Sequence, residues 1–190
     1  MAKLFGNLHL VLAIGLVAAI AVMMAFAPST PVDANSVLRW LHVFFGIVWI
    51  GLLYYLNFVQ VPTMPSIPAE LKPAIIGHIA PKVFFFFRYA ALLTVITGLS
   101  IAVVGGYAHQ AMTFTGEGRV NLIGLGMWIA LVMAFNVWFV IWPAQKKVLG
   151  IVEATPEEKA AAAPRALIAS RLNTLLSLPM LYCMVSANLG

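Results

Sequence analysis

Five long apolar runs divide this 190-residue chain, and none of them contains an acidic residue. Hydrophobic residues make up 63% of the sequence and charged residues 9%, whereas soluble domains carry about 25% charged residues. A soluble core has too little volume for so many apolar side chains, but side chains in a bilayer can face lipid. Because lipid excludes unpaired backbone groups, the runs predict an all-α, polytopic membrane helix bundle. The six carboxylate side chains lie outside the runs, at Asp33, Glu70, Glu117, Glu153, Glu157 and Glu158.

The predicted bundle is a single integral membrane domain over residues 1–190, with five transmembrane helices at about residues 8–27, 37–59, 83–104, 122–142 and 164–187. The first run resembles a signal peptide because Lys3 precedes it. We expect it to be retained, since about 20 apolar residues suffice to cross a bilayer. Asn35 and Ser36 can cap the second helix, and Pro164 suits the first turn of the fifth. Five prolines predict a broken connection after the second helix: Pro62, Pro65, Pro68, Pro73 and Pro81.

The distribution of lysine and arginine predicts an N-in, C-out orientation. With a cytoplasmic N-terminus, Arg39 and Arg119 are the basic residues outside, and all the others lie on or near the cytoplasmic side. Because these residues adjoin the spans and form no basic patch, the net charge of +5 does not indicate nucleic-acid binding. The cytoplasmic set is Lys3, Lys72, Lys82, Arg88, Lys146, Lys147, Lys159, Arg165 and Arg171.

The second predicted helix carries the clearest polar pattern. At about 100° per residue, one face holds His42, Gly46 and Trp49 together with the amides Asn57 and Gln60. A polar face in a membrane helix turns toward the bundle interior. A histidine near a glycine indicates a b-type haem site, in which His42 ligates the iron and Gly46 lets a flat ring approach the backbone. The alternative is that His42 hydrogen-bonds a neighbouring helix or interfacial water.

A second haem ligand is sought among the remaining histidines. On the predicted topology His109 lies toward the same outer side as His42, and His9 with His78 forms a second possible pair at the inner side. Each of these three can instead be an interfacial or loop histidine.

Three further side chains can act at the cofactor. Met180 or Met184 can also be an axial ligand, although methionine more often fills gaps in a core. Arg88 can pair with a haem propionate or an anionic substrate, or extend to lipid phosphate.

Three strings carry a family resemblance: residues 39–51 (RWLHVFFGIVWIG) with 54–62 (YYLNFVQVP), residues 136–150 (NVWFVIWPAQKKVLG), and residues 170–180 (SRLNTLLSLPM). They are similar to blocks of the bacterial membrane-bound urate oxidase N-terminal domain family. The resemblance implies a protein of the bacterial inner membrane. In longer members this domain is joined to a cytochrome c domain and is implicated in urate oxidation, with electrons passing to the respiratory chain. The sequence has no Cys-x-x-Cys-His motif, so we expect it to lack the cytochrome c domain.

Two functions follow as expectations. The first is a membrane redox module that binds haem b through His42 and passes electrons to a separate cytochrome or quinone. The alternative is a non-catalytic subunit that packs within a larger respiratory or photosynthetic complex, which suits the small size of the chain. Membrane lipid and other membrane protein subunits are the expected partners in either case. Ion-coupled transport is disfavoured because the predicted spans contain no carboxylates.

Overall fold

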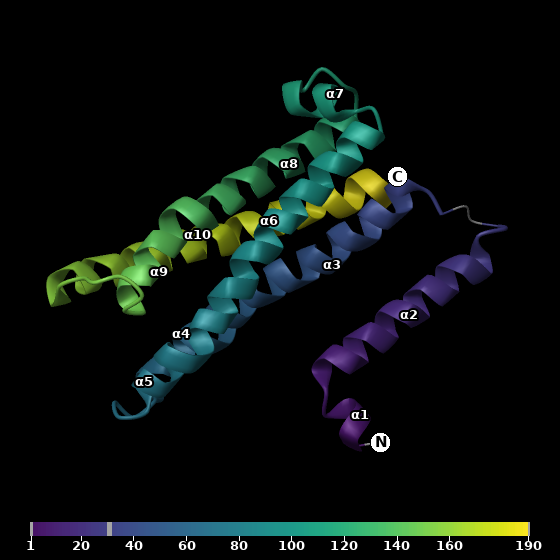
Figure 1. The fold of residues 1–190 in the computed structure, drawn as a ribbon. Coiled ribbons are helices and arrows are strands. Elements are labelled where there is room, and N and C mark those ends of the chain that lie inside the picture. Colours follow the sequence, from purple (N-terminus) through teal and green to yellow (C-terminus); the bar gives the residue numbers. More distant parts are fainter. Residues whose placement is uncertain (1, 30–31, 190) are drawn as a thin grey trace. The chain divides into compact units, whose positions relative to one another are not determined.

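The computed structural model of the chain describes residues 2–29 and 32–189, and over these residues it contains helices and no strand (Figure 1). The chain forms two compact units, Met1–Val37 and Leu38–Gly190, and each is described by itself. The prediction of an all-helical fold is confirmed. The prediction of a single domain over the whole chain stays a prediction.

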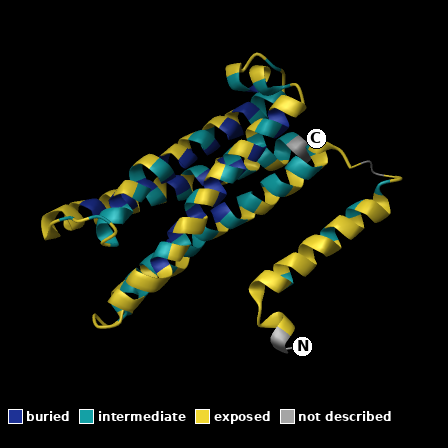
Figure 2. Cartoon of the chain, in the orientation of Figure 1, coloured by how far each residue is buried: buried dark blue, intermediate teal, exposed yellow. Residues whose placement is uncertain are grey.

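The first unit contains α1 (Ala2–Phe5) and α2 (Leu8–Phe26). Asn7 caps α2, because its side-chain oxygen accepts a hydrogen bond of 3.2 Å from the Leu10 N–H. No residue of α2 is buried, and Figure 2 shows the helix exposed along its length. An apolar helix without a buried face is suited to a surrounding of lipid.

The cap of the next helix, α3 (Ala34–Tyr54), differs from the sequence prediction. Asp33 precedes the helix, and its carboxylate accepts a hydrogen bond of 2.7 Å from the Ser36 N–H. The Ser36 hydroxyl in turn accepts one of 3.1 Å from the Asp33 N–H. This reciprocal pair works like a capping box. Asp33 is therefore the N-cap, and Asn35 and Ser36 lie inside the helix.

The second unit is built from four long helical segments and one short helix. The segment that starts with α3 continues through η1 (Tyr55–Gln60), α4 (Val61–Thr63) and η2 (Met64–Ser66). The next comprises α5 (Lys72–Ala74), η3 (Ile75–Ile79) and α6 (Ala80–Val104). The short helix α7 (Ala108–Thr113) leads to α8 (Arg119–Phe135), η4 (Asn136–Ile141) and α9 (Trp142–Val148), and the chain ends with α10 (Pro156–Leu189).

Five helical segments of the described residues are long and apolar enough to cross a membrane, which is the number predicted. The last four have 30 to 33 residues and are longer than expected. At a rise of 1.5 Å per residue they extend over about 45–50 Å, compared with a hydrocarbon thickness of about 30 Å. The segments are Leu8–Phe26, Ala34–Ser66, Lys72–Val104, Arg119–Val148 and Pro156–Ala187.

Prolines that were expected to interrupt helices are accommodated by wider turns. Proline lacks an N–H, and its ring crowds the carbonyl four residues earlier. A π-helical turn relieves this conflict, because the preceding residue bonds to a carbonyl five residues back. Three such turns, η1, η3 and η4, end two residues before Pro62, Pro81 and Pro143. The i−5 hydrogen bonds run from Val61 to Leu56, from Ala80 to Ile75 and from Trp142 to Val137.

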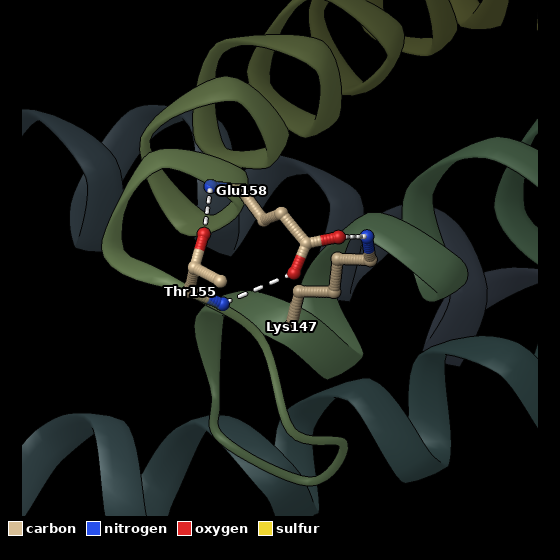
Figure 3. A network of polar contacts seen from close by, with 3 residues as sticks. All are labelled: Lys147, Thr155 and Glu158. Carbon is tan, nitrogen blue, oxygen red and sulfur yellow. Dashed lines mark hydrogen bonds and ion pairs between the residues drawn. The ribbon is translucent and has the colours of Figure 1, made fainter.

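The last helix begins earlier than predicted, at Pro156 rather than near Pro164. Thr155 caps it: the Thr155 hydroxyl accepts a hydrogen bond of 3.2 Å from the Glu158 N–H, and the Glu158 carboxylate accepts one of 3.0 Å from the Thr155 N–H. Lys147 at the end of α9 forms an ion pair of 2.8 Å with the same carboxylate (Figure 3). Pro164 therefore lies inside a continuous helix.

Buried amides connect the segments near the middle of the second unit. The Asn136 side-chain N–H₂ donates to the Ala169 carbonyl and to the Asn173 side-chain oxygen, each at 2.9 Å. Asn173 donates to the Met133 carbonyl at 3.1 Å, and Asn57 donates to the Ser170 hydroxyl at 2.8 Å. A hydrogen bond of 2.9 Å also joins the hydroxyls of Tyr54 and Ser177. We call this set the amide layer: Tyr54, Asn57, Asn136, Ser170, Asn173 and Ser177.

Close packing of α8 on α10 depends on small residues. A Cβ atom placed on Gly126 would lie 2.8 Å from the Cβ of Cys183, so the two helices approach closely only with glycine at this position. Cys183 is a free cysteine and is 2% exposed, in keeping with its small size and apolar surroundings.

Candidate functional site

A cavity of about 640 Å³ lies among α3, α6, α8 and α10. Its walls are mainly apolar, and a small number of polar side chains face it, as is typical of sites for small molecules and cofactors. The polar and sulfur-bearing lining residues are Arg39, His42, Thr94, Tyr107, Met127, Met180 and Met184. We call this space the His42 cavity.

His42 is held in a defined orientation by α6. Its Nδ1 atom lies 2.9 Å from the Thr94 carbonyl oxygen and 3.2 Å from the Thr97 hydroxyl oxygen. Because a carbonyl can only accept, Nδ1 carries the proton in this hydrogen bond. In the neutral ring the lone pair is then on Nε2, which has no hydrogen-bond partner among the described residues. An imidazole that donates one N–H to a backbone carbonyl and keeps the other nitrogen free has the arrangement common in metal-ligating histidines.

Gly98 provides the space for this ring. A Cβ atom at Gly98 would lie 2.8 Å from Cε1 and 3.2 Å from Nδ1 of His42. The imidazole therefore lies directly against the backbone of α6. The polar pattern of the second predicted helix does not reveal this contact, because Gly98 belongs to another helix.

Gly46 and Trp49, which the sequence placed on the face of His42, also line the cavity. A Cβ atom added to Gly46 would meet no atom within 4 Å, so bare backbone borders open space here. The Trp49 side chain is fully buried, and its Nε1–H has no hydrogen-bond partner among the described residues. A buried unpaired donor costs about 1–3 kcal/mol. A ligand with an acceptor at this position would remove that cost.

Arg39 and Tyr107 supply polar groups to the same cavity. Burial raises the pKa of the Tyr107 phenol, with the nearby charge of Arg39 acting in the opposite direction, and the net shift is upward. Tyr107 therefore stays protonated at neutral pH and keeps its O–H as a donor. Neither residue was predicted from the sequence as part of a site. The spacing of Arg39, three positions before His42 on one helix, is the signal that could have found the arginine.

Three thioethers face the cavity from the opposite helices. Met127 comes from α8, and Met180 and Met184 come from α10. The sequence named Met180 and Met184 as alternative axial ligands, and the structure places both on the cavity that His42 lines. Met127 was not predicted.

Arg88 is not among the residues that line the His42 cavity. Its guanidinium carbon lies 3.3 Å from the ring centroid of Trp142 and 5.5 Å from that of Trp138. Its Nε donates a hydrogen bond of 3.1 Å to the Phe84 carbonyl. The structure thus surrounds Arg88 with aromatic rings, and the pairing with a haem propionate stays a prediction.

The other three histidines are not among the residues that line the His42 cavity. His109 on α7 and His78 on η3 are exposed, and neither lines the cavity. His9 is exposed on α2, in the other unit. The pairs His42 with His109 and His9 with His78 stay predictions. Across the described residues, no group of three or more His, Cys, Asp or Glu side chains is placed to hold a metal ion.

Comparison with known protein families identifies the second half of the chain. The model of the family described as urate oxidase N-terminal matches residues 85–190, which is more than half of the chain. The matched region includes most of α6 and all of α7, α8 and α10, whereas α3 with His42 lies before it. No curated protein and no solved structure matches the chain.

Proposed function

Because this chain belongs to the urate oxidase N-terminal family, we propose that it is an integral membrane redox module that binds haem b at His42. In this proposal it passes electrons to a separate cytochrome or quinone. The observation that carries the proposal is the pairing of His42 Nδ1 with the Thr94 carbonyl, at 2.9 Å, on the wall of a cavity. This pairing leaves Nε2 free to act as a ligand.

The proposed setting is the bacterial inner membrane, with the N-terminus in the cytoplasm. Five long apolar helical segments in the described residues support membrane insertion. The uneven distribution of lysine and arginine supports the orientation. The His42 cavity then lies toward the outer side of the membrane, because its lining residues on α3 fall within or next to the first half of the segment Ala34–Ser66 and those on α6 fall in the second half of the segment Lys72–Val104.

Each cavity residue has a distinct role in this proposal. His42 would hold the iron through Nε2, while the Thr94 carbonyl fixes the tautomer and the direction of the ring. Gly46 leaves room for a flat macrocycle beside α3. Arg39 and Tyr107 would bind the propionates. When bound, the haem supplies a reversible one-electron couple at its iron.

A second side chain would complete the proposed site by also holding the iron. Met180 and Met184 both line the His42 cavity, and His109 is the candidate from the predicted topology. A methionine ligand would raise the reduction potential relative to a second histidine. Variants of each residue distinguish these ligands by their absorption spectra.

The alternative is a non-catalytic subunit of a larger respiratory or photosynthetic complex. The apolar α2, which has no buried residue, favours it, because such a helix can pack against another membrane protein as well as against lipid. In that case the His42 cavity would hold lipid or a side chain from the partner.

A reduced-minus-oxidised visible spectrum of the protein purified in mild detergent tests the proposal. We expect a b-type difference band that is lost in His42→Ala and kept in His78→Ala, which replaces an exposed histidine away from the cavity. A colourless wild-type protein that co-purifies with a large complex would contradict the redox proposal and support the alternative.

A further inference from the structure

A second hollow lies between α6 and α8. None of its described lining residues also lines the His42 cavity. Its volume is about 640 Å³. Leu92 and Val95 line it from α6, and the opposite wall runs from Trp128 to Phe139 along α8 and η4. The lining side chains are apolar apart from two indole N–H groups. We call this hollow the α6–α8 groove.

The length of the groove matches one leaflet of a bilayer. The wall from Trp128 to Phe139 rises about 16 Å at 1.5 Å per residue. Half of a hydrocarbon core of about 30 Å is about 15 Å. The groove is therefore long enough for a single hydrocarbon chain from one leaflet to lie along it.

Arg88 marks one end of the groove. It precedes Leu92 by one helical turn on α6, and its guanidinium carbon lies 5.5 Å from the ring centroid of Trp138, which lines the groove. No carboxylate among the described residues forms an ion pair with Arg88, so none balances its charge.

A second donor lies at the same end. The Trp138 Nε1–H is buried and has no hydrogen-bond partner among the described residues. The indole of Trp128 at the far end differs, since it donates to the Met112 carbonyl at 3.0 Å. The end of the groove near Arg88 thus combines an unbalanced positive charge with an unpaired N–H, and both are complementary to an anion.

We propose that the α6–α8 groove binds an anionic phospholipid, with its phosphate on Arg88 and one acyl chain along the groove. A zwitterionic lipid carries its own cation beside the phosphate and adds no net negative charge at Arg88, and a free phosphate ion leaves the apolar groove unfilled. On the proposed orientation, Arg88 lies near the cytoplasmic leaflet, where basic pockets between transmembrane helices bind anionic head groups. The site is independent of haem binding, and its test does not depend on the His42 cavity.

Native mass spectrometry in mild detergent tests the head group. The wild-type protein is titrated with dioleoyl phosphatidylglycerol, with dioleoyl phosphatidylcholine, and with inorganic phosphate as a competitor. We expect one phosphatidylglycerol molecule to bind with a roughly fivefold preference over phosphatidylcholine. Arg88→Gln should remove the preference, Arg88→Lys should retain most of it, and Arg171→Gln, an exposed arginine on α10, should leave it unchanged.

The groove is tested with a pair of variants on α6. Leu92→Trp fills the groove and should lower the binding of both lipids. Ile96→Trp changes a 49% exposed residue one turn further along, outside the groove, and should have no effect. An unchanged lipid preference in Arg88→Gln, or unchanged binding in Leu92→Trp, would overturn the proposal. If inorganic phosphate displaces phosphatidylglycerol at similar concentrations, the site binds an anion without using the acyl chain, and the lipid proposal is wrong.

Discussion

The His42 cavity and the amide layer both include residues of the segment that starts with α3 but differ in how their polar atoms are paired. In the amide layer, the side-chain N–H₂ groups of Asn57, Asn136 and Asn173 all donate to protein oxygens. At the cavity, the hydrogen bonds of His42 among the described residues are made by Nδ1 and leave Nε2 without one, and the Trp49 Nε1–H is buried without a partner. The donors of the amide layer hold helices together, whereas the unpaired nitrogens at the cavity are the basis of the proposed ligand site.

One atom of the amide layer departs from this contrast. The Asn57 side-chain oxygen is buried and has no partner in the described residues. It lies in η1, where Asn57 Nδ2 donates to the Leu53 carbonyl of its own helix at 2.9 Å. The N–H₂ group of Asn57 nevertheless donates to two protein oxygens. Trp49 differs, because its one polar group is a donor without a partner among the described residues.

The largest expected effect comes from filling the cavity. Gly46→Leu places a side chain where no atom lies within 4 Å. We expect the haem affinity to fall at least tenfold, which corresponds to a loss of about 1.4 kcal/mol of binding free energy. Replacing a helical glycine should leave stability equal or raise it by up to about 1 kcal/mol. The measurements are the haem-to-protein absorbance ratio and the thermal melting temperature in detergent.

Gly15→Leu is the matched control for this variant. Gly15 lies inside α2, and a Cβ atom there also meets no atom within 4 Å, but the residue does not line the cavity. It should gain the same helix propensity with full haem content. Equal haem loss in both glycine variants would show that the effect is not specific to the cavity.

A smaller effect, on stability alone, is expected in the amide layer. Asn173→Ala removes the hydrogen bonds to Asn136 and to the Met133 carbonyl. At about 0.6 kcal/mol per bond in a membrane protein, the loss is about 1–2 kcal/mol once the vacated space is included. Unfolding in mixed micelles measures it, and the haem spectrum should not change. A spectral change as large as that of Gly46→Leu would show that the amide layer and the His42 cavity act as one functional site, and would contradict the distinction between them.

How far the sequence predicts this molecule differs between its elements. Helix number and type follow from the apolar runs, because lipid permits few alternatives. Helix ends do not follow, since the π turns before Pro62, Pro81 and Pro143 carry helices through residues that normally stop them. The capping box at Thr155 and Glu158 is readable as a sequence motif, although the prediction started the helix near Pro164 instead.

The candidate site was predictable where residues of a single helix could be grouped, as on α3 and, for Met180 and Met184, on α10. His42, Gly46 and Trp49 share a face of α3, so helical periodicity alone groups them. The positions of Tyr107 and Met127 depend on how α6, α7 and α8 pack, which periodicity cannot provide. The same packing places Arg88 against Trp142 instead of against the cavity.

The smallest expected effects come from single hydrogen-bonding groups, one in each region. Trp49→Phe removes an unpaired donor, so the stability of the ligand-free protein should change by less than about 1 kcal/mol. Because Nε1 is expected to bond to the ligand, the haem affinity should fall about fivefold.

Tyr54→Phe removes the hydrogen bond to Ser177 and should cost about 0.6 kcal/mol of stability without a change in haem affinity. Haem titration and melting temperature report both values. The reverse pattern would refute the division into paired and unpaired regions.

Chemical rescue of His42→Gly tests most directly whether the free nitrogen of His42 is a haem ligand. The variant leaves space for an imidazole molecule against Gly98 and Thr94, which hold the side chain in the wild-type protein. We expect the purified variant to lack the b-type difference spectrum and added imidazole to restore it, with no such response in His78→Gly. A variant that keeps the wild-type spectrum without imidazole would contradict ligation by His42.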